Sequence, residues 1–235
     1  MSLGIILGSR QRSAPVAKLV KAEPLPQAFR LSAARIPNEY YPTPPEATRA
    51  LLSVERFDGS IWEPACGEGA IASVLTEAGH SVVATDLVDY GYGIPRVDFL
   101  KETRPRAKHI VTNPPYGSGL ADAFIERSLA FARETRGTVA MLLNLSSLAH
   151  RTRTRWWQAH PPARLYAIDD IVCWPERHYG PAPSHFLKHR YFWAVWTPDH
   201  NEAGAPSTRR PSFWWLSSAE FRQRQPISNN NKRRS

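Results

Sequence analysis

The sequence predicts an α/β fold with an open, mostly parallel sheet and helices on both faces. Strand-like and helical segments alternate from residue 45 to about 145, as happens when helices connect parallel strands. A turn with two glycines separates the first strand from the helix that follows it. Polar residues follow several strands, at the edge where such sheets bind ligands. We therefore expect the functional residues at the carboxyl ends of the strands.

Each element has its own local signal. A helix is expected over 45–52, because Pro45 suits a first turn, where the backbone N–H is not needed. A strand over 61–63 ends at Pro64, and a helix over 70–78 is ended by Gly79. The other expected elements are an amphipathic helix over 120–133 and strands over 81–85, 109–112, 138–143, 164–171 and 191–196.

Composition excludes several classes of protein. The 235 residues carry a net charge of +9, and 42% of them are hydrophobic, which is ordinary for a globular chain. Two cysteines exclude a disulfide scaffold and suggest a reducing compartment. No apolar run approaches the roughly 20 residues of a membrane helix, and the apolar run over 3–7 is too short for a signal peptide. We expect a location in the cytoplasm of a bacterial or phage-infected cell.

The positive charge lies mostly at the two ends. Residues 1–37 contain six Lys or Arg and one acidic residue, and residues 201–235 contain seven and two. We expect a basic irregular arm over 1–37, a catalytic domain over 38–200 and a basic tail over 201–235. Within the tail, Ser217 and Glu220 fit a capping box for a short helix, and the aromatic residues 213–215 are expected to pack on the core. Basic ends of this kind suit contact with nucleic acid.

A candidate cofactor site follows the first two strands. Gly67 and Gly69 allow a sharp turn and a close approach of ligand to backbone. Asp86 ends the next strand, 19 residues after Gly67, where a carboxylate binds ribose hydroxyls in nucleoside-binding folds. Glu63 and Glu68 would repel a pyrophosphate and suit a cationic cofactor, which favours S-adenosylmethionine over NAD. Further along, Asp98 can accept a hydrogen bond from an adenine amino group, while Phe99 or Leu87 covers the ring.

A candidate catalytic segment follows the strand over 109–112. The tetrapeptide Asn113-Pro114-Pro115-Tyr116 lacks two backbone donors because of its prolines. The Asn113 side-chain oxygen and the Pro114 carbonyl can both accept from one exocyclic amino group, which stabilises charge as its nitrogen attacks a methyl group. Tyr116 offers a ring on which an extruded base can stack.

These segments together resemble the amino-group DNA methyltransferases that use S-adenosylmethionine. Residues 38–200 follow the gamma motif order of adenine-N6 enzymes, and small phage and prophage enzymes look closest. The resemblance implies a Rossmann-like class I methyltransferase fold and Asn113, Pro114, Pro115 and Tyr116 as catalytic residues. The cofactor-binding residues that it implies are Tyr41, Thr43, Glu63, Ala65, Gly67, Gly69, Asp86, Leu87, Asp98 and Phe99.

The expected function is methyl transfer to the N6 amino group of adenine in DNA, with DNA as the partner. RNA adenine, cytosine N4 and protein glutamine remain alternative substrates, and a non-catalytic nucleic-acid-binding module is the alternative of another class. The family usually carries a large recognition domain, for which this chain has no room. No membrane contact and no obligate protein partner are expected.

The last third offers further candidates. Arg151, Arg153 and Arg155 fit phosphate contacts beside stacked bases, or equally a solvated helix face with Trp156 and Trp157 in the core. Three aromatics could cover the second face of a target base: Tyr179, Phe186 and Phe192. No metal is expected, because the spacing of Cys173, His178, His185 and His189 fits no common motif. Cys66 is expected to be a packing residue.

Overall fold

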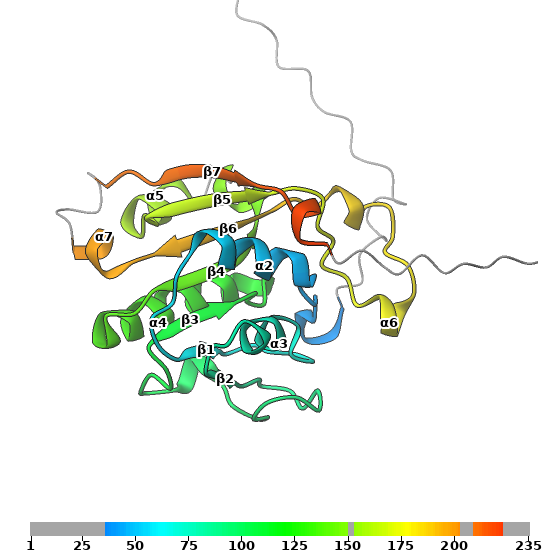
Figure 1. Ribbon diagram of the computed structural model, residues 1–235, viewed down its shortest axis with the longest axis horizontal. Coiled ribbons are helices and arrows are strands. Elements are labelled where there is room, and N and C mark those ends of the chain that lie inside the picture. The colour runs from blue at the N-terminus through cyan, green and yellow to red at the C-terminus, as the bar shows by residue number, and fades with distance from the viewer. Residues whose placement is uncertain (1–35, 150–152, 203–208, 223–235) are drawn as a thin grey trace, which may run out of the picture. The chain divides into compact units, whose positions relative to one another are not determined.

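The computed structural model describes residues 36–149, 153–202 and 209–222. Its framework is a sheet of seven strands in the order β2-β1-β3-β4-β6-β5-β7 (Figure 1). In chain order the strands are β1 (Ile61–Glu63), β2 (Val82–Ala84), β3 (His109–Thr112), β4 (Val139–Asn144), β5 (Arg164–Ile168), β6 (Tyr191–Trp196) and β7 (Ser212–Leu216). Residues 1–35 of the arm predicted over 1–37 lie outside the described residues.

All strands except β6 run in the same direction. β1 pairs in parallel with β2 and β3, and β3 pairs in parallel with β4. β6 is antiparallel to both of its neighbours, β4 and β5, and β7 is parallel to β5. The carboxyl ends of six strands therefore meet at one edge of the sheet, together with the start of β6 at Tyr191.

Helices cover both faces of the sheet. The α-helices are α2 (Pro45–Val54), α3 (Ala70–Glu77), α4 (Leu120–Thr135), α5 (Thr154–Ala159), α6 (Glu176–Tyr179) and α7 (Pro198–Glu202). Single turns of 3-10 helix lie at η1 (Pro37–Glu39), η2 (Phe99–Lys101), η3 (Gly117–Gly119), η4 (Leu145–Ala149), η5 (Phe186–Lys188) and η7 (Ala219–Phe221). Within the described ranges, no helix is both long and apolar enough to cross a bilayer.

Two hydrophobic clusters fill the space between the layers. On one face, Leu51 of α2 and Leu75 of α3 pack on residues of β3 to β6. On the other, Ile125 of α4 packs on the opposite side chains of the same strands, with Trp156 and Trp157 of α5 partly buried beside it. The predicted open, mostly parallel sheet with helices on both faces is thereby confirmed.

The sheet extends further along the chain than the expected catalytic domain. β7 lies within residues 201–235, which were expected to form a tail. Contrary to the expected packing, its aromatic side chains are exposed: Phe213 by 42%, Trp214 by 57% and Trp215 by 79%. The reason is that β7 is the edge strand of the sheet. The expected capping helix is the single turn η7, and its Ser217 hydroxyl donates to Asp169 instead of capping it.

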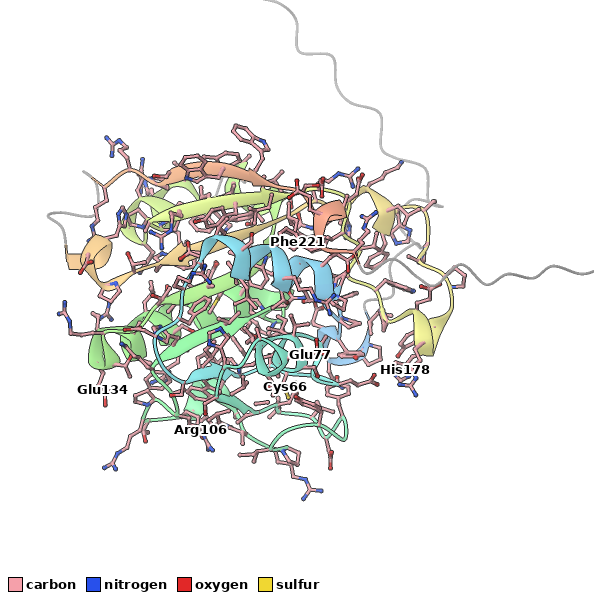
Figure 2. All side chains as sticks on the ribbon, viewed as in Figure 1. Cys66, Glu77, Arg106, Glu134, His178 and Phe221 are labelled. Carbon is pink, nitrogen blue, oxygen red and sulfur yellow. The ribbon has the colours of Figure 1, made fainter. Side chains whose placement is uncertain are left out.

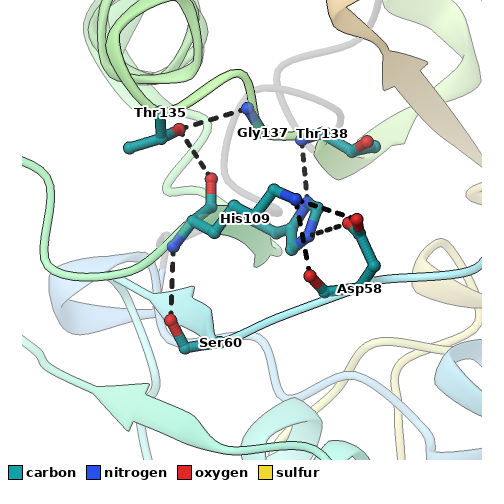
Figure 3. A network of polar contacts seen from close by, with 7 residues as sticks. Asp58, Ser60, His109, Thr135, Gly137 and Thr138 are labelled. Carbon is teal, nitrogen blue, oxygen red and sulfur yellow. Dashed lines mark hydrogen bonds and ion pairs between the residues drawn. The ribbon is translucent and has the colours of Figure 1, made fainter.

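A buried histidine, His109, holds the amino ends of the central strands. The His109 Nδ1 atom accepts a hydrogen bond from the Thr138 backbone N–H at 2.9 Å, so the ring carries its proton on Nε2 and donates to Asp58 at 3.0 Å (Figure 3). Close by, the backbone is packed so tightly that a Cβ on Gly137 would lie 1.7 Å from the Lys108 carbonyl oxygen. This network fixes the amino ends of β3 and β4, and thereby the strands that carry the candidate site.

Candidate active site

A cavity of about 370 Å³ lies at the carboxyl ends of β1, β2 and β3. Its volume is within the range of ligand clefts, roughly 300–1,000 Å³. Of the predicted site residues, the cavity wall contains Tyr41, Thr43, Glu63, Ala65, Gly67, Asp86, Leu87, Asp98, Phe99, Asn113 and Pro115. The structure thus brings together residues that are up to 74 positions apart in the chain.

The charge of the cavity wall has one sign. Four acidic residues line it: Glu39, Glu63, Asp86 and Asp98. Lysine, arginine and histidine are absent from the described lining residues. A cavity of this kind repels phosphate groups and favours a ligand with a positive charge.

The glycine turn shapes one wall of the cavity. Gly67 has φ of +53°, and a Cβ there would lie 2.5 Å from the Tyr40 ring. Gly69 has φ of +84°, and a Cβ there would lie 2.5 Å from the Tyr92 ring, although Gly69 does not line the cavity itself. Both positions therefore require glycine for backbone conformation and for space. Tyr40 also stacks on Tyr90 at 4.7 Å between ring centroids.

Asp86 ties the turn to the end of β2. Its Oδ2 atom accepts from the Gly67 backbone N–H at 2.8 Å, and its Oδ1 atom accepts from the Val88 N–H at 2.8 Å. Burial raises the pKa of Asp86 above its usual range, against the effect of these hydrogen bonds. Each carboxylate oxygen retains lone pairs that can accept from a ligand hydroxyl.

Glu63 brings an unpaired carboxylate oxygen into this cavity. The side chain is 2% exposed, and its Oε2 atom has no hydrogen-bond partner in the described structure. Burial and the neighbouring charge of Asp86 raise the pKa of Glu63 well above its usual range, although the Ala72 backbone N–H stabilises the charged form. A buried acceptor without a partner costs stability, so this oxygen suits a cationic or hydrogen-bonding ligand.

Two other residues of the turn, Glu68 and Cys66, have other roles, although Cys66 also lines the cavity. Glu68 lies outside the cavity wall and contacts His178 Nε2 at 2.5 Å, so the predicted charge effect is exerted by Glu63 and not by Glu68. Figure 2 shows Cys66 at the turn and His178 on α6. Burial raises the pKa of the Cys66 thiol to about 12, which leaves it protonated and supports a packing role.

The next segment closes the cavity beyond β2. Asp98 lines the wall while its Oδ1 atom accepts from the Leu100 N–H at 3.1 Å, and Lys101 pairs with it at 3.1 Å. Phe99 is a core residue, 2% exposed, that presents only part of its ring to the cavity. Leu87 is 61% exposed and borders the opening.

Asn113 is held in one orientation by the segment before α2. Its Nδ2 group donates to the Tyr41 carbonyl at 2.9 Å and to the Thr43 hydroxyl at 3.1 Å. Both partners are acceptors here, so the amide nitrogen is fixed on that side and the Oδ1 atom serves as the acceptor. Thr43 is itself buried, with 3% exposure.

Tyr116 contacts that acceptor. Its hydroxyl can donate to Asn113 Oδ1 or to the Leu142 carbonyl, which lies at 3.0 Å. Asn113 Oδ1 therefore has Tyr116 as one partner and keeps a second lone pair that can accept from a ligand. The Tyr116 ring packs against both hydrophobic clusters. Neither Tyr116 nor Pro114 is among the residues that line the cavity. Stacking of a base on Tyr116 stays a prediction.

The structure separates the three aromatics considered for the second face of a base. Phe192 is fully buried in β6 and is excluded. Phe186 is 9% exposed and packs on Trp174 and Tyr41. Tyr179, at the end of α6, is 51% exposed and is the one of the three that can contact a ligand without repacking.

The arginines considered for phosphate contact differ from one another. Arg153 pairs with Asp122, and its guanidinium lies about 5 Å from the ring centroids of Trp156 and Trp157. It therefore stabilises the packing of α5 on α4. Arg155 is exposed, and Arg151 lies outside the described residues.

Some residues of the site were not predicted. Asn38, Glu39, Tyr40, Val88 and Tyr90 also line the cavity. Tyr40 directly precedes Tyr41, so its place beside a predicted cofactor-binding residue was the one feature of the sequence that could have indicated it. Tyr90 lies in the loop after Asp86 and carries no motif.

No protein-family model and no curated protein matches the chain. Among solved structures, it is similar to a TehB-like SAM-dependent methyltransferase from Corynebacterium glutamicum, with 18% identity, 66% of this chain and 87% of that chain covered, and a TM-score of 0.42. It is also similar to a modification subunit assigned to a type I restriction enzyme from Vibrio vulnificus, with 14% identity, coverage of 75% and 46%, and a TM-score of 0.49.

A third similar structure is the glycopeptide N-methyltransferase MtfA complexed with sinefungin, with 16% identity, coverage of 49% and 62%, and a TM-score of 0.36. Because all three TM-scores lie below 0.5, we base the function of this chain on its own residues.

Proposed function

We propose that this chain transfers a methyl group from S-adenosylmethionine to the N6 amino group of adenine in DNA. The observation that carries the proposal is the Asn113 amide beside an acidic cavity: Tyr41 and Thr43 fix its nitrogen, and its oxygen, which accepts from Tyr116, keeps a second lone pair as an acceptor. An acceptor held in place before the reaction stabilises charge that develops on an amino group.

The cavity fits this cofactor. S-adenosylmethionine supplies a methyl group on a positively charged sulfur and carries an ammonium group, a ribose and an adenine. Glu63 Oε2 lacks a partner and suits a positive charge, while Asp86 can accept from ribose hydroxyls at the end of β2. Asp98 and Phe99 lie further along the same wall, where an adenine ring would be bound. A dinucleotide is disfavoured, because its phosphates would meet four acidic side chains.

The protein residues act by position and polarity. Asn113 lies in the wall of the cofactor cavity, which supports a role in holding the amino group that receives the methyl group. Holding both reactants in this way removes much of the entropic cost of their encounter. Bound here, S-adenosylmethionine would supply the methyl group, and Asn113 would hold the amino nitrogen that attacks the methyl carbon. The sulfur would keep the electron pair of the broken carbon–sulfur bond, and the amino proton would leave to water.

Substituting Asn113 tests this proposal. Asn113→Ala should slow single-turnover methyl transfer by about 100-fold to 1,000-fold, the usual effect of losing one preorganised polar group. S-adenosylmethionine affinity, measured by calorimetry, should stay within about twofold, since Asn113 acts on the substrate amino group.

Asn144→Ala is the matched control, because Asn144 ends the neighbouring strand β4 and bonds only locally, to Ser146. It should keep the parent rate. Full activity of Asn113→Ala would refute the proposed role.

A further inference from the structure

The edge strand β7 carries an aromatic surface that the proposed active site does not use. Phe213, Trp214 and Trp215 are exposed by 42%, 57% and 79%, whereas Leu216 packs on the core. Alternation along a strand places Phe213 and Trp215 on one face of the sheet, and their rings touch with centroids 5.1 Å apart. Trp214 points to the other face. Exposed aromatic surface of this extent usually marks a site of interaction.

A groove adjoins Trp215 at the carboxyl edge of the sheet. It has a volume of about 460 Å³, and its walls include Leu145, Ala167, Tyr191 and Trp215. Ala167 and Trp215 are partners in the pairing of β5 with β7, and both line the groove. Trp215 is therefore part of the wall of a groove and is not an isolated exposed side chain.

The groove opens at the same edge of the sheet as the candidate active site. Asn113 follows β3, and β7 lies four strands away from β3 in the order β3-β4-β6-β5-β7. With about 4.8 Å between neighbouring strands, the two sites are roughly 19 Å apart along this edge. A chain-like substrate that reaches the first site can continue to the second.

One cation of the groove, Arg190, can contact a phosphate beside the aromatic wall. Arg190 lines the groove, and its Nη1 atom donates to the Leu187 and His189 carbonyls, which leaves other guanidinium donors for a ligand. Two acidic residues also line it. Asp169 is bound by the Ser217 hydroxyl and the Ser218 N–H.

The second acidic residue, Glu220, is exposed at the rim. An aromatic face next to a guanidinium is the combination that binds an unpaired base and its phosphate.

We infer that this groove binds an unpaired nucleotide of the same DNA strand whose adenine enters the Asn113 cavity. The inference rests on the proposed function and deepens it: the substrate is DNA with a single-stranded segment around the target base. The indole of Trp215 stacks on the base, and Arg190 contacts the phosphate.

A second copy of the chain is a poorer occupant. An aromatic side chain presents about 150–250 Å². With the exposed fractions above, β7 offers about 300–450 Å² of aromatic surface, against roughly 800 Å² per partner in a stable interface. A stacked nucleotide with a charged phosphate contact needs much less area.

Two tryptophan variants of the full chain test the inference. Affinity for a fluorescein-labelled single-stranded DNA with one adenine is measured by anisotropy, with the matching duplex alongside. Trp215→Ala should weaken single-strand binding by about fivefold to 150-fold, the worth of one base stacked on an aromatic ring. Trp214→Ala is the matched control on the opposite face and should bind within about twofold of the parent. Arg190→Gln should make the salt slope shallower by about 0.7.

The outcomes separate this inference from the proposed function. Unchanged binding by Trp215→Ala, with methyl transfer intact in the parent, would overturn the groove and leave the proposed function standing. If the parent transfers no methyl group but Trp215→Ala alone loses DNA binding, the groove stands and the proposed function fails. Equal losses in both tryptophan variants, or a parent dimer that both variants convert to monomer in sedimentation, would assign β7 to a second copy and overturn the inference.

Discussion

Replacing Glu63 with glutamine is expected to stabilise the ligand-free protein and to weaken cofactor binding. The parent side chain is a buried carboxylate with one oxygen unpaired, and its pKa is raised well above the usual range by burial and by Asp86. Glutamine keeps the shape and removes the charge. The same unpaired charge that costs stability in the empty cavity becomes favourable when a cation binds.

The two effects have comparable sizes. An unsatisfied buried polar group costs about 1–3 kcal/mol, and we expect a gain of about 1 kcal/mol in unfolding free energy because the amide still leaves a polar atom there. A hydrogen bond between charged groups is worth about 1.5–3 kcal/mol. Its loss should weaken S-adenosylmethionine binding by about tenfold to 150-fold.

The stability effect also has a predictable pH dependence. A carboxyl whose pKa is raised by folding binds its proton more tightly in the native state, so the native state loses stability as pH rises above the unfolded value. That usual value is 4.5 for Glu63. The unfolding free energy of the parent should therefore fall relative to that of Glu63→Gln between about pH 4.5 and neutrality.

Urea unfolding at several pH values and calorimetric titration with S-adenosylmethionine measure both effects. Glu77→Gln is the matched control, because Glu77 lies at the end of α3 away from the glycine turn and pairs with Arg49 at the surface. It should change neither quantity appreciably. A Glu63→Gln variant that is less stable than the parent and binds the cofactor equally well would refute the reasoning.

Three further expectations follow from other parts of the structure. Burial lowers the pKa of His109 below its usual 6.5, so stability should fall as pH drops below about 6.5, and urea unfolding should show a smaller fall in His109→Gln. Gly67→Ala should weaken cofactor binding in calorimetry, whereas Gly91→Ala, also at positive φ but with nothing within 4 Å of its Cβ, should cost only roughly 1–2 kcal/mol of stability. Removing residues 223–235, which include four Lys or Arg, should make the salt dependence of DNA binding shallower in anisotropy titrations without changing cofactor affinity.

The strands and helices around the cavity were predictable because their signals are local. The strands over 61–63, 109–112 and 191–196 have the expected bounds, and proline or a polar residue follows the first two. The helix expected over 120–133 extends to Thr135, since nothing in the sequence marks its last turn sharply. β7 was missed because a short aromatic run resembles a core segment until its neighbours are known.

The contacts inside the site could be predicted only in part. Placement of Glu63, Asp86 and Asn113 at strand ends follows from the alternation of elements, and the structure brings all three to one cavity. The bonds that hold Asn113 come from residues 70 and 72 positions away, so no local pattern reveals them. Likewise, Glu68 contacts His178 instead of lining the cavity, and His178 is 110 residues further along the chain, so no local pattern indicates this contact.

The central claim is that the chain methylates adenine N6 in DNA. The most direct measurement incubates the full chain with methyl-deuterated S-adenosylmethionine and single-stranded DNA, duplex DNA or RNA, then digests each to nucleosides for mass analysis. We expect deuterated N6-methyladenine from DNA with the parent, and a loss of that product with Asn113→Ala. Label confined to N4-methylcytosine, to RNA or to added protein, or no label in any acceptor, would contradict the claim.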